Sequence, residues 1–317
     1  MVTLKLQQHT RKSQKIPFQK IWDKVLSYGA RNLYGLFHNP GLFVVRKLAR
    51  IELFREGLFW ASQITKTPPK VDSKTSLIAS DSTVEAIVAS IEQQGYFAGL
   101  QLHPCVVQQI LDYAQTGICS GDRTLKFPYD QKEQVETKQG KKFLCCSYPV
   151  EDSPIIMQLV QDKTILAIAS QYLKAKPVYV SGELLWSYPI EASQSEKLSM
   201  AQVFHYDLDD VRSIKLFFYL NDVDAFNGAH VCIQNSHRGK PIMHQLLGQR
   251  CASIPDERIV SCYGAENVVT FCGKAGFGFV EDPCCFHKGA APIAGERLLL
   301  QLQFSVHDHG NVRACNI

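Results

Sequence analysis

The arrangement of hydrophobic and polar positions changes near the middle of the chain. Before residue 177, apolar residues recur three or four positions apart, a spacing that predicts amphipathic helices. After that point, short apolar runs alternate with Gly, Pro and Asn, which predicts short strands joined by turns. We therefore expect a mainly β fold with flanking α-helices, an antiparallel sandwich or jelly roll with the helices packed outside it.

Three helices are predicted between residues 81 and 176. One covers residues 83–94, where Asp81, Ser82 and Thr83 offer a cap and Gly95 ends it. A second covers residues 103–116, and a third residues 153–173. Residues 119–142 and 190–200 are polar, and we expect both to be loops. Such loops could close over a site.

The strands are predicted by apolar, β-branched and aromatic runs. Asn227-Gly228 is a strong turn signal, so residues 229–234 should form a return strand after it. Residues 238–266 form a long mixed insertion. The other predicted strands cover residues 178–186, 203–207, 214–220, 268–271, 276–280 and 297–306.

The N-terminal part differs from the rest in charge. Residues 1–80 contain 14 Lys and Arg against 4 Asp and Glu, a net charge of +10, and the remainder is mildly acidic. Residues 17–65 predict two helices separated by Asn39-Pro40-Gly41, and a polar linker follows. We therefore divide the chain into a basic, aromatic helical segment, 1–80, and a main domain, 81–317. A solvated helical face is the simpler explanation of the charge. No nucleic-acid partner is expected, and peripheral membrane contact through residues 1–80 is the alternative.

Composition is that of a globular protein, with 45% hydrophobic and 20% charged residues. The N-terminus has no signal-peptide pattern, and the eleven cysteines include no Cys-x-x-Cys. Reduced thiols in a cytoplasmic protein are the expected state.

Candidate chemistry begins at His205 and Asp207. If residues 203–207 form a strand, alternation places both side chains on one face. An imidazole beside a carboxylate is two thirds of a two-His-one-carboxylate metal site, which suits non-haem Fe(II). The simpler alternative is a buried polar pair that stabilises the strand.

A third ligand has to come from elsewhere. Among the ten histidines, His287 stands out because Arg297 follows it at the start of an apolar strand. An Fe(II) enzyme that activates O₂ with a keto acid needs a fixed cation for the far carboxylate, and arginine provides one bidentately. His237 is the rival ligand, although a turn-capping role suits it better. A surface ion pair with Glu281 or Glu296 is the alternative for Arg297.

These residues resemble a known family. The motif His205-x-Asp207, then Asn227-Gly228, Ser236-His237, His287 and Arg297 is similar to the phytanoyl-CoA dioxygenase family of Fe(II)/2-oxoglutarate oxygenases. Two further stretches, Gln94-Gly95-Tyr96 and Tyr172-Leu173-x-x-x-Pro177, resemble the start of the family's core. The likeness covers roughly residues 83–310 and implies a double-stranded β-helix, a cupin-like jelly roll.

The resemblance also implies roles. His205, Asp207 and His287 would bind Fe(II), Arg297 would bind the 2-oxoglutarate carboxylate, and Phe217 would support this co-substrate. The chain departs from the family at Gln234-Asn235-Ser236-His237, where Pro-Gly-Ser-His is common, and at Lys288-Gly289, where a small hydroxyl residue is common.

The implied function is a dioxygenase that uses O₂ and 2-oxoglutarate. Because related halogenases lack the carboxylate ligand, Asp207 favours hydroxylation, or desaturation, over halogenation. A small-molecule, lipid-like or natural-product substrate is implied, and the aromatic residues Trp186, Tyr188 and Tyr206 suggest that it is partly apolar. The alternative is a non-catalytic jelly-roll binding module with a vestigial metal site.

Strand alternation adds one more candidate. It places Lys215, Phe217 and Tyr219 on one face, which we expect to line the cavity because it carries the polar ends. Lys215 then contacts co-substrate or substrate, or else lies on the rim. The neighbouring pair Asp209-Asp210 is expected in a solvated turn or in a salt bridge with Arg212.

Overall fold

The computed structural model describes residues 37, 40–63, 76–249 and 254–308. The helix expected before Asn39 and most of the linker lie outside the described residues. The chain divides into two units, residues 1–44 and 45–317, and the second contains every strand that the structure describes. Within the described part, none of the helices combines the length and the apolar character needed to cross a membrane.

The structure contains more helices than the sequence predicts. The helices are α2 (Pro40–Leu48), α3 (Glu52–Gln63), α4 (Val84–Gln94), α5 (Pro104–Thr116), α6 (Lys132–Gln139), α7 (Pro154–Val160), α8 (Lys163–Leu173), α9 (Gln194–Ser199), α10 (Ile242–Leu247) and α11 (Asp256–Tyr263), with short 3₁₀ turns η1 (Tyr129–Gln131), η2 (Val150–Asp152) and η3 (Ala265–Asn267).

The strands are β1 (Ile78–Ala79), β2 (Tyr96–Leu102), β3 (Ile118–Gly121), β4 (Leu125–Pro128), β5 (Cys145–Tyr148), β6 (Val178–Ser187), β7 (Ser213–Tyr219), β8 (His230–Ile233), β9 (Val268–Phe271), β10 (Phe277–Glu281), β11 (His287–Gly289) and β12 (Arg297–Ser305). Six of the predicted strands form, as β6, β7, β8, β9, β10 and β12, whereas β1 to β5 and β11 were not predicted.

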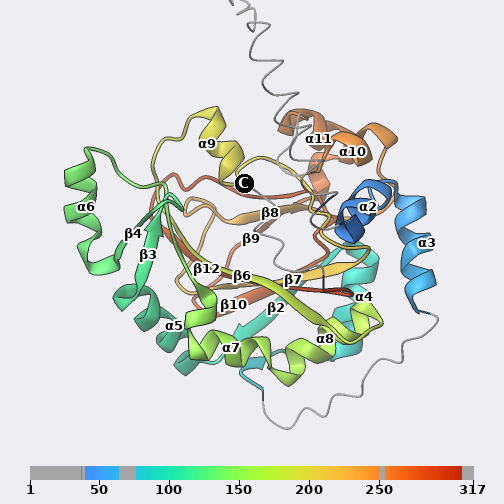
Figure 1. Ribbon diagram of the computed structural model, residues 1–317, viewed down its shortest axis with the longest axis horizontal. Coiled ribbons are helices and arrows are strands. Elements are labelled where there is room, and N and C mark those ends of the chain that lie inside the picture. Colours follow the sequence, from blue (N-terminus) through green and yellow to red (C-terminus); the bar gives the residue numbers. More distant parts are fainter. Residues whose placement is uncertain (1–36, 38–39, 64–75, 250–253, 309–317) are drawn as a thin grey trace, which may run out of the picture. The chain divides into compact units, whose positions relative to one another are not determined.

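Two antiparallel sheets form the core (Figure 1). The large sheet runs β1-β2-β10-β7-β12-β6-β5-β3-β4, and the small sheet runs β11-β8-β9. From β6 onward the chain passes repeatedly between them: β6, β7, β10 and β12 join the large sheet, whereas β8, β9 and β11 join the small one. A bridge at His205 adds to the small sheet beside β11. This arrangement is that of a double-stranded β-helix, so the predicted jelly roll is confirmed.

The large sheet has two different faces. Leu216, Phe218, Leu298, Leu300 and Leu302 belong to the main core together with buried residues of α4, α5, α7 and α8, the helices that cover the outer face (Figure 1). Alternate positions therefore point the other way, toward the space between the sheets. Polar residues can be placed there without disturbing the helix-covered core.

Helix α3 packs on the jelly roll by one face only. Phe59 is buried in the main core, and Arg55 Nη2 donates to His237 O at 3.4 Å. On its other face, Leu53, Phe54 and Trp60 are 80%, 53% and 58% exposed. The helix is therefore amphipathic with an uncovered apolar side.

Both predicted loops are partly wrong. Residues 119–142 contain the hairpin β3–β4, η1 and α6, because one buried side chain per strand, Cys119 and Phe127, is enough to attach the hairpin to the core. Residues 190–200 contain α9, which begins with a capping box formed by Ser193 and Glu196.

Two other predictions need correction. The predicted helix 153–173 is broken into α7 and α8, because Asp162 caps α8 and also accepts from Ser76 Oγ and Leu77 N. The segment after Asn227-Gly228 does form β8, but it pairs with β9 and β11 rather than returning along β7. The turn there transfers the chain to the small sheet.

Candidate metal centre and its pocket

The segment 203–207 forms isolated bridges instead of the predicted strand. His205 N donates to His287 O at 3.0 Å, and His287 N donates to His205 O at 2.7 Å. Asp207 N donates to Pro283 O at 2.8 Å, so the chain leaves the sheet immediately after the bridge. The two histidines, about 80 residues apart in sequence, are therefore held opposite each other by backbone bonds.

The three expected ligands lie together. His205 Nε2 is 3.9 Å from Asp207 Oδ1, and His287 Nε2 is 3.5 Å from Asp207 Oδ2. One ligand atom from each residue lies within 4.8 Å of the other two. Among the described residues, no other group of three His, Cys, Asp or Glu side chains meets this condition. A single ion could contact all three.

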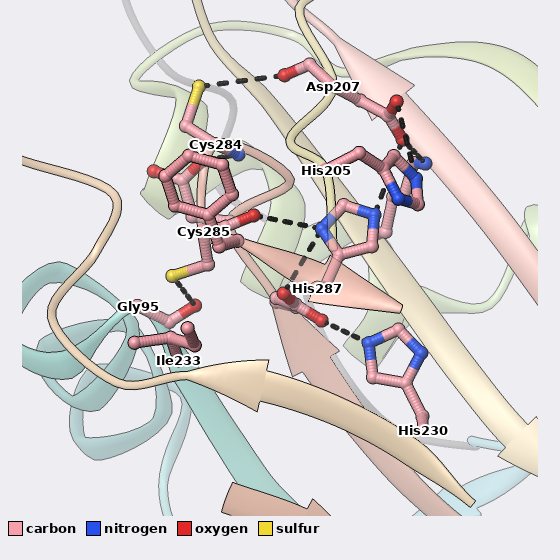
Figure 2. Close-up of polar contacts among 12 residues, drawn as sticks. Gly95, His205, Asp207, His230, Ile233, Cys284, Cys285 and His287 are labelled. Carbon is pink, nitrogen blue, oxygen red and sulfur yellow. Dashed lines mark hydrogen bonds and ion pairs between the residues drawn. The ribbon is translucent and has the colours of Figure 1, made fainter. Parts of the chain in front are cut away.

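Backbone carbonyls orient both imidazoles, and the contact between His287 and Cys285 can be followed in Figure 2. His205 Nδ1 lies 2.9 Å from Val203 O, and His287 Nδ1 lies 2.9 Å from Cys285 O. Because a carbonyl only accepts, each Nδ1 carries the hydrogen, and the lone pair is left on Nε2, the nitrogen nearer to Asp207. This is the arrangement by which outer contacts fix the tautomer of metal-binding histidines.

The charges of the site also suit a cation. Burial, with help from the neighbouring His287, lowers the pKa of His205 to about 4, so its imidazole is neutral at ordinary pH. Burial alone would raise the pKa of Asp207, but the Lys215 ammonium beside it outweighs burial and holds that pKa well below its ordinary value. The group thus combines an ionised carboxylate with an imidazole that offers its lone pair.

Lys215 is not a rim residue. It lies on β7, is only 6% exposed, and its Nζ forms an ion pair with Asp207 Oδ2. Its ammonium also lines the pocket beside the ligand group.

Arg297 is buried at the first position of β12. Its Nη2 donates to Ser187 Oγ at 3.2 Å, its Nη1 donates to Gly228 O, and its Nε has no hydrogen-bond partner. Neither suggested carboxylate pairs with it: Glu281 contacts histidines instead, and no described carboxylate forms an ion pair with Arg297. A buried guanidinium of this kind is suited to an anionic ligand.

Gly289 explains one departure from the family pattern. A Cβ at this position would lie 3.1 Å from Arg297 Nη2, so a side chain here would crowd the guanidinium. The hydroxyl that contacts the arginine comes from Ser187, on the neighbouring strand.

The remaining residues of the predicted cavity face take different positions. Phe217 lines the pocket and stacks on Phe279, with ring centroids 4.8 Å apart. Tyr219 points the same way but is fully buried, where its hydroxyl donates to Phe271 O at 2.9 Å and accepts from His230 N. It is therefore part of the support beneath the pocket.

His237 does not approach the ligand group. Its Nε2 lies 3.3 Å from Glu92 O, at the end of α4, rather than capping a turn. Its pKa is raised because, although burial opposes the charge, Cys285 and Asp282 favour it. His237 therefore does not belong to the group of possible ligand atoms, which contains only His205, Asp207 and His287 among the described residues.

Two residues of the site were missed by sequence reasoning. His230 Nε2 lies 2.7 Å from Glu281 Oε2, and Glu281 Oε1 lies 3.4 Å from His287 Nδ1 (Figure 2). Glu281 pairs across the sheet with Lys215, so both face inward. Glu281 follows Phe279 by two positions in the sequence. Strand alternation would therefore have placed both side chains on the same inward face.

The Asp209-Asp210 prediction was wrong. Asp209 lines the pocket, where its Oδ2 accepts from Gln303 Nε2 at 3.1 Å. Asp210 is buried and accepts from the backbone N of Val211 and of His307. Arg212 instead pairs with Glu92 at 3.4 Å.

The pocket has a volume of about 300 Å³. Trp186, Tyr188 and Tyr206 do not line it, so the aromatic residues on which the expectation of a partly apolar substrate depended lie elsewhere. The lining residues are Arg123, Ser181, Glu183, Leu185, Ser199, Met200, Ala201, His205, Asp207, Asp209, Lys215, Phe217, His230, His287, Gly289, Arg297, Leu299, Gln301 and Gln303.

Comparison with known proteins gives structural likenesses only. No family model matches the chain, and no curated protein matches its sequence. Among solved structures, it is similar to SnoN, a non-heme alpha ketoglutarate dependent epimerase from nogalamycin biosynthesis, with 15% identity and a TM-score of 0.49 over 73% of this chain and 87% of that one. EctD from S. alaskensis with bound Fe has 16% identity and a TM-score of 0.47 over 77% and 88%. AviO1 from Streptomyces viridochromogenes Tue57 has 15% identity and a TM-score of 0.44 over 70% and 95%. Function therefore has to be argued from the side chains of this chain.

Proposed function

We propose that this protein is an Fe(II)- and 2-oxoglutarate-dependent dioxygenase, most simply a hydroxylase. The observation that carries the proposal is the convergence of His205, Asp207 and His287, whose ligand atoms lie within 4.8 Å of one another. Arg297 supports it, because the same pocket holds this buried guanidinium without a carboxylate partner among the described residues.

The donor set fits Fe(II). Two imidazole nitrogens and one carboxylate are the facial triad of non-haem Fe(II) oxygenases, and such a triad leaves coordination positions open. Bound Fe(II) would supply O₂ activation coupled to decarboxylation of 2-oxoglutarate. The overall reaction converts a substrate C–H group, O₂ and 2-oxoglutarate into C–OH, succinate and CO₂, with one oxygen atom in the hydroxyl and the other in succinate.

The residues of the chain have distinct parts in this proposal. His205, Asp207 and His287 hold the ion, and the carbonyls of Val203 and Cys285 keep both imidazoles in the ligating tautomer. Arg297 would bind the far carboxylate of 2-oxoglutarate through its guanidinium.

The other two candidate co-substrate contacts act through shape and charge. Phe217 forms an apolar part of the wall, and Lys215 balances the charge of Asp207 until the ion is bound. Water exclusion by the surrounding sheets would protect the reaction from side products.

Asp207 also bears on the type of reaction. A carboxylate ligand occupies the position that a halide needs in the halogenases of this family, so hydroxylation is proposed over halogenation. Membership of the phytanoyl-CoA dioxygenase family is part of the same proposal, supported by the spacing of His205, Asp207, His287 and Arg297.

A non-catalytic binding module is the competing function. It requires only that the jelly roll and a vestigial site remain. The intact ligand group, its oriented imidazoles and the arginine weigh against it, because a vestigial site would not need all of these together.

The test uses the full chain loaded with Fe(II) under anaerobic conditions. Isothermal titration with 2-oxoglutarate should show binding that requires the metal, and admission of O₂ should yield succinate. A protein that binds metal but not 2-oxoglutarate would favour the binding module.

A membrane contact is a second proposed property, and it concerns the N-terminal segment, 1–80. The exposed Leu53, Phe54 and Trp60 on α3 support it, as does the net charge of +10 in this segment. Apolar side chains beside basic residues suit the surface of an anionic bilayer. The division at residue 80 and a cytoplasmic location belong to the same set of proposals.

A further inference from the structure

The pocket wall opposite the small sheet is built from aligned rows of side chains. Across β6, β12 and β7, Ser181 pairs with Gln303, and Gln303 pairs with Lys215. In the next row, Glu183 pairs with Gln301, and Gln301 pairs with Phe217. All of these residues line the pocket. One row is therefore entirely polar, and the next is polar at two of its three positions.

Hydrogen bonds hold this polar wall in place. Ser181 Oγ donates to Gln303 Oε1 at 3.4 Å, and Gln303 Nε2 donates to Asp209 Oδ2 at 3.1 Å. At the mouth of the pocket, Arg123 forms an ion pair with Glu183 at 2.9 Å. Gln303 is only 3% exposed, so its amide orientation is set by these neighbours.

Apart from Lys215 and Phe217, the residues of these rows have no part in the proposed metal and co-substrate contacts. Arg297 and Ser187 lie at one end of the strand pair β6–β12, whereas Ser181 and Gln303 lie six residues further along each strand. With an ion at the ligand group and 2-oxoglutarate on Arg297, the remaining wall presents the carboxylates of Asp209 and Glu183 and the amides of Gln301 and Gln303. Carboxylates accept hydrogen bonds, and amides both accept and donate them.

Size and polarity together limit the substrate. The volume of about 300 Å³ lies at the lower end of ligand pockets, and it has to contain 2-oxoglutarate as well. An acyl chain placed against this wall would exclude water from its carboxylates and amides and would offer them no hydrogen bonds in return, which is costly. Sites built to hydrogen-bond a substrate strongly reject analogues that lack the matching groups.

We infer that the substrate is a small hydroxyl-rich molecule, about the size of a monosaccharide ring, whose hydroxyl or ammonium groups are bound by Asp209, Gln301 and Gln303. This inference rests on the proposed function, since it assigns the polar wall to the substrate of that reaction. It replaces the partly apolar substrate expected from the sequence. Hydroxyl and ammonium groups have one property in common here: both donate hydrogen bonds to carboxylate and amide oxygens.

The experiment measures binding to the anaerobic full chain loaded with Fe(II) and 2-oxoglutarate. The probes are D-glucose, D-glucosamine and decanoic acid, each followed by isothermal titration and by succinate formation after O₂ is admitted. The inference predicts that a sugar probe binds and increases succinate formation, and that decanoic acid does neither. D-Glucosamine tests whether the wall binds an ammonium group, and D-glucose tests whether hydroxyl groups alone are sufficient.

Variants locate the effect. Asp209→Asn should weaken D-glucosamine binding about tenfold, the usual effect of losing a hydrogen bond to a charged group, and D-glucose binding by less. Gln303→Leu should weaken both. The matched control is the exposed pair Gln108 and Asp112 on α5, which has the same hydrogen bond at 2.8 Å outside the pocket. Gln108→Leu and Asp112→Asn should change neither probe.

The outcomes separate the two proposals. Failure to bind 2-oxoglutarate would contradict the proposed function itself. If 2-oxoglutarate binds but decanoic acid increases succinate formation, or neither sugar binds, the dioxygenase stands and the inferred substrate class is wrong. Sugar binding that Asp209→Asn and Gln303→Leu leave unchanged would also overturn the assignment to this wall.

Discussion

The ammonium of Lys215 forms an ion pair with the carboxylate of Asp207, the residue that we assign as the acidic metal ligand. Lys215 is 6% exposed, and the side chain of Asp207 retains 18% of its surface in the pocket. Without a metal, the positive charge next to Asp207 is the ammonium of Lys215. Bound Fe(II) would place a second positive charge there. Metal binding and the stability of the fold are therefore linked through this carboxylate.

Lys215→Met should lower the stability of the metal-free protein. Removing one member of a buried ion pair leaves the other charge uncompensated, and with the partial exposure of Asp207 we expect a loss of about 2–3 kcal/mol in the free energy of unfolding. Added Fe(II) should recover more stability in the variant than in the wild type, because the ion replaces the missing positive charge. Urea unfolding with and without metal measures both effects.

The control for this substitution is an exposed ion pair of similar type. Lys274 Nζ lies 2.6 Å from Asp222 Oδ2, with side chains 87% and 60% exposed. Lys274→Met should leave the unfolding midpoint and its response to metal unchanged. Equal metal responses in Lys215→Met and in the wild type would contradict the link between Lys215 and the metal site.

Arg297→Gln should weaken 2-oxoglutarate binding without removing the metal. Loss of a buried, bidentate charge partner costs about 2–4 kcal/mol, or roughly 30- to 1,000-fold in affinity. Titration calorimetry of the Fe(II)-loaded protein measures it. Arg212→Gln is the matched control, because Arg212 pairs with Glu92 outside the pocket. A similar loss in both variants would point to a general structural effect.

Glu281→Gln should lower metal affinity through the position of His287. Glu281 Oε1 lies 3.4 Å from His287 Nδ1, and its other oxygen contacts His230 at 2.7 Å. Outer contacts of this kind contribute about 10- to 100-fold in metal affinity. Competition with a coloured chelator measures the change.

A second buried glutamate provides the control for this prediction. Glu136 accepts from Phe143 N at 2.9 Å and lies outside the metal pocket. Glu136→Gln should leave metal affinity at the wild-type value, even where it reduces stability. If Glu281→Gln also keeps full metal affinity, Glu281 does not position His287.

The membrane proposal predicts salt-sensitive binding to anionic vesicles. The full chain should sediment with vesicles of phosphatidylserine and phosphatidylcholine at low salt but not with phosphatidylcholine alone. Replacing Leu53 and Trp60 by Ser should reduce this binding. Ile118→Ser is the control, because Ile118 on β3 is 59% exposed, close to the 58% of Trp60. If the α3 substitutions leave vesicle binding unchanged, the exposed apolar face of α3 has no role in it.

Local patterns were sufficient for the fold class, and the three side chains that the family resemblance suggested as ligands do lie together. Alternation along β7 places Lys215 and Phe217 on the pocket side, and the apolar run after Arg297 forms the long strand β12. The capping box at Ser193 and Glu196 was also present in the sequence and would have revealed α9.

The other features of the site could not be predicted, because they depend on how strands far apart in the sequence pair with one another. The contact of Glu281 with the histidines depends on β10 pairing beside β7, which no local spacing indicates. Asp209 looked like a turn residue, yet it lies between the buried residues Leu208 and Asp210 and lines the pocket. The polar wall formed by Ser181, Gln301 and Gln303 likewise appears only when β6 and β12 are aligned. Substrate chemistry was therefore the part least accessible from sequence.

The most direct test of the central claim compares the wild type with Asp207→Ala in 2-oxoglutarate turnover. Both proteins are exposed to Fe(II) without oxygen, checked for native folding by circular dichroism, and then given 2-oxoglutarate and O₂. We predict that the wild type forms succinate and that the folded Asp207→Ala variant forms none. Succinate formation by the variant at the wild-type rate, or its absence from both proteins together with no binding of 2-oxoglutarate, would contradict the assignment of this centre.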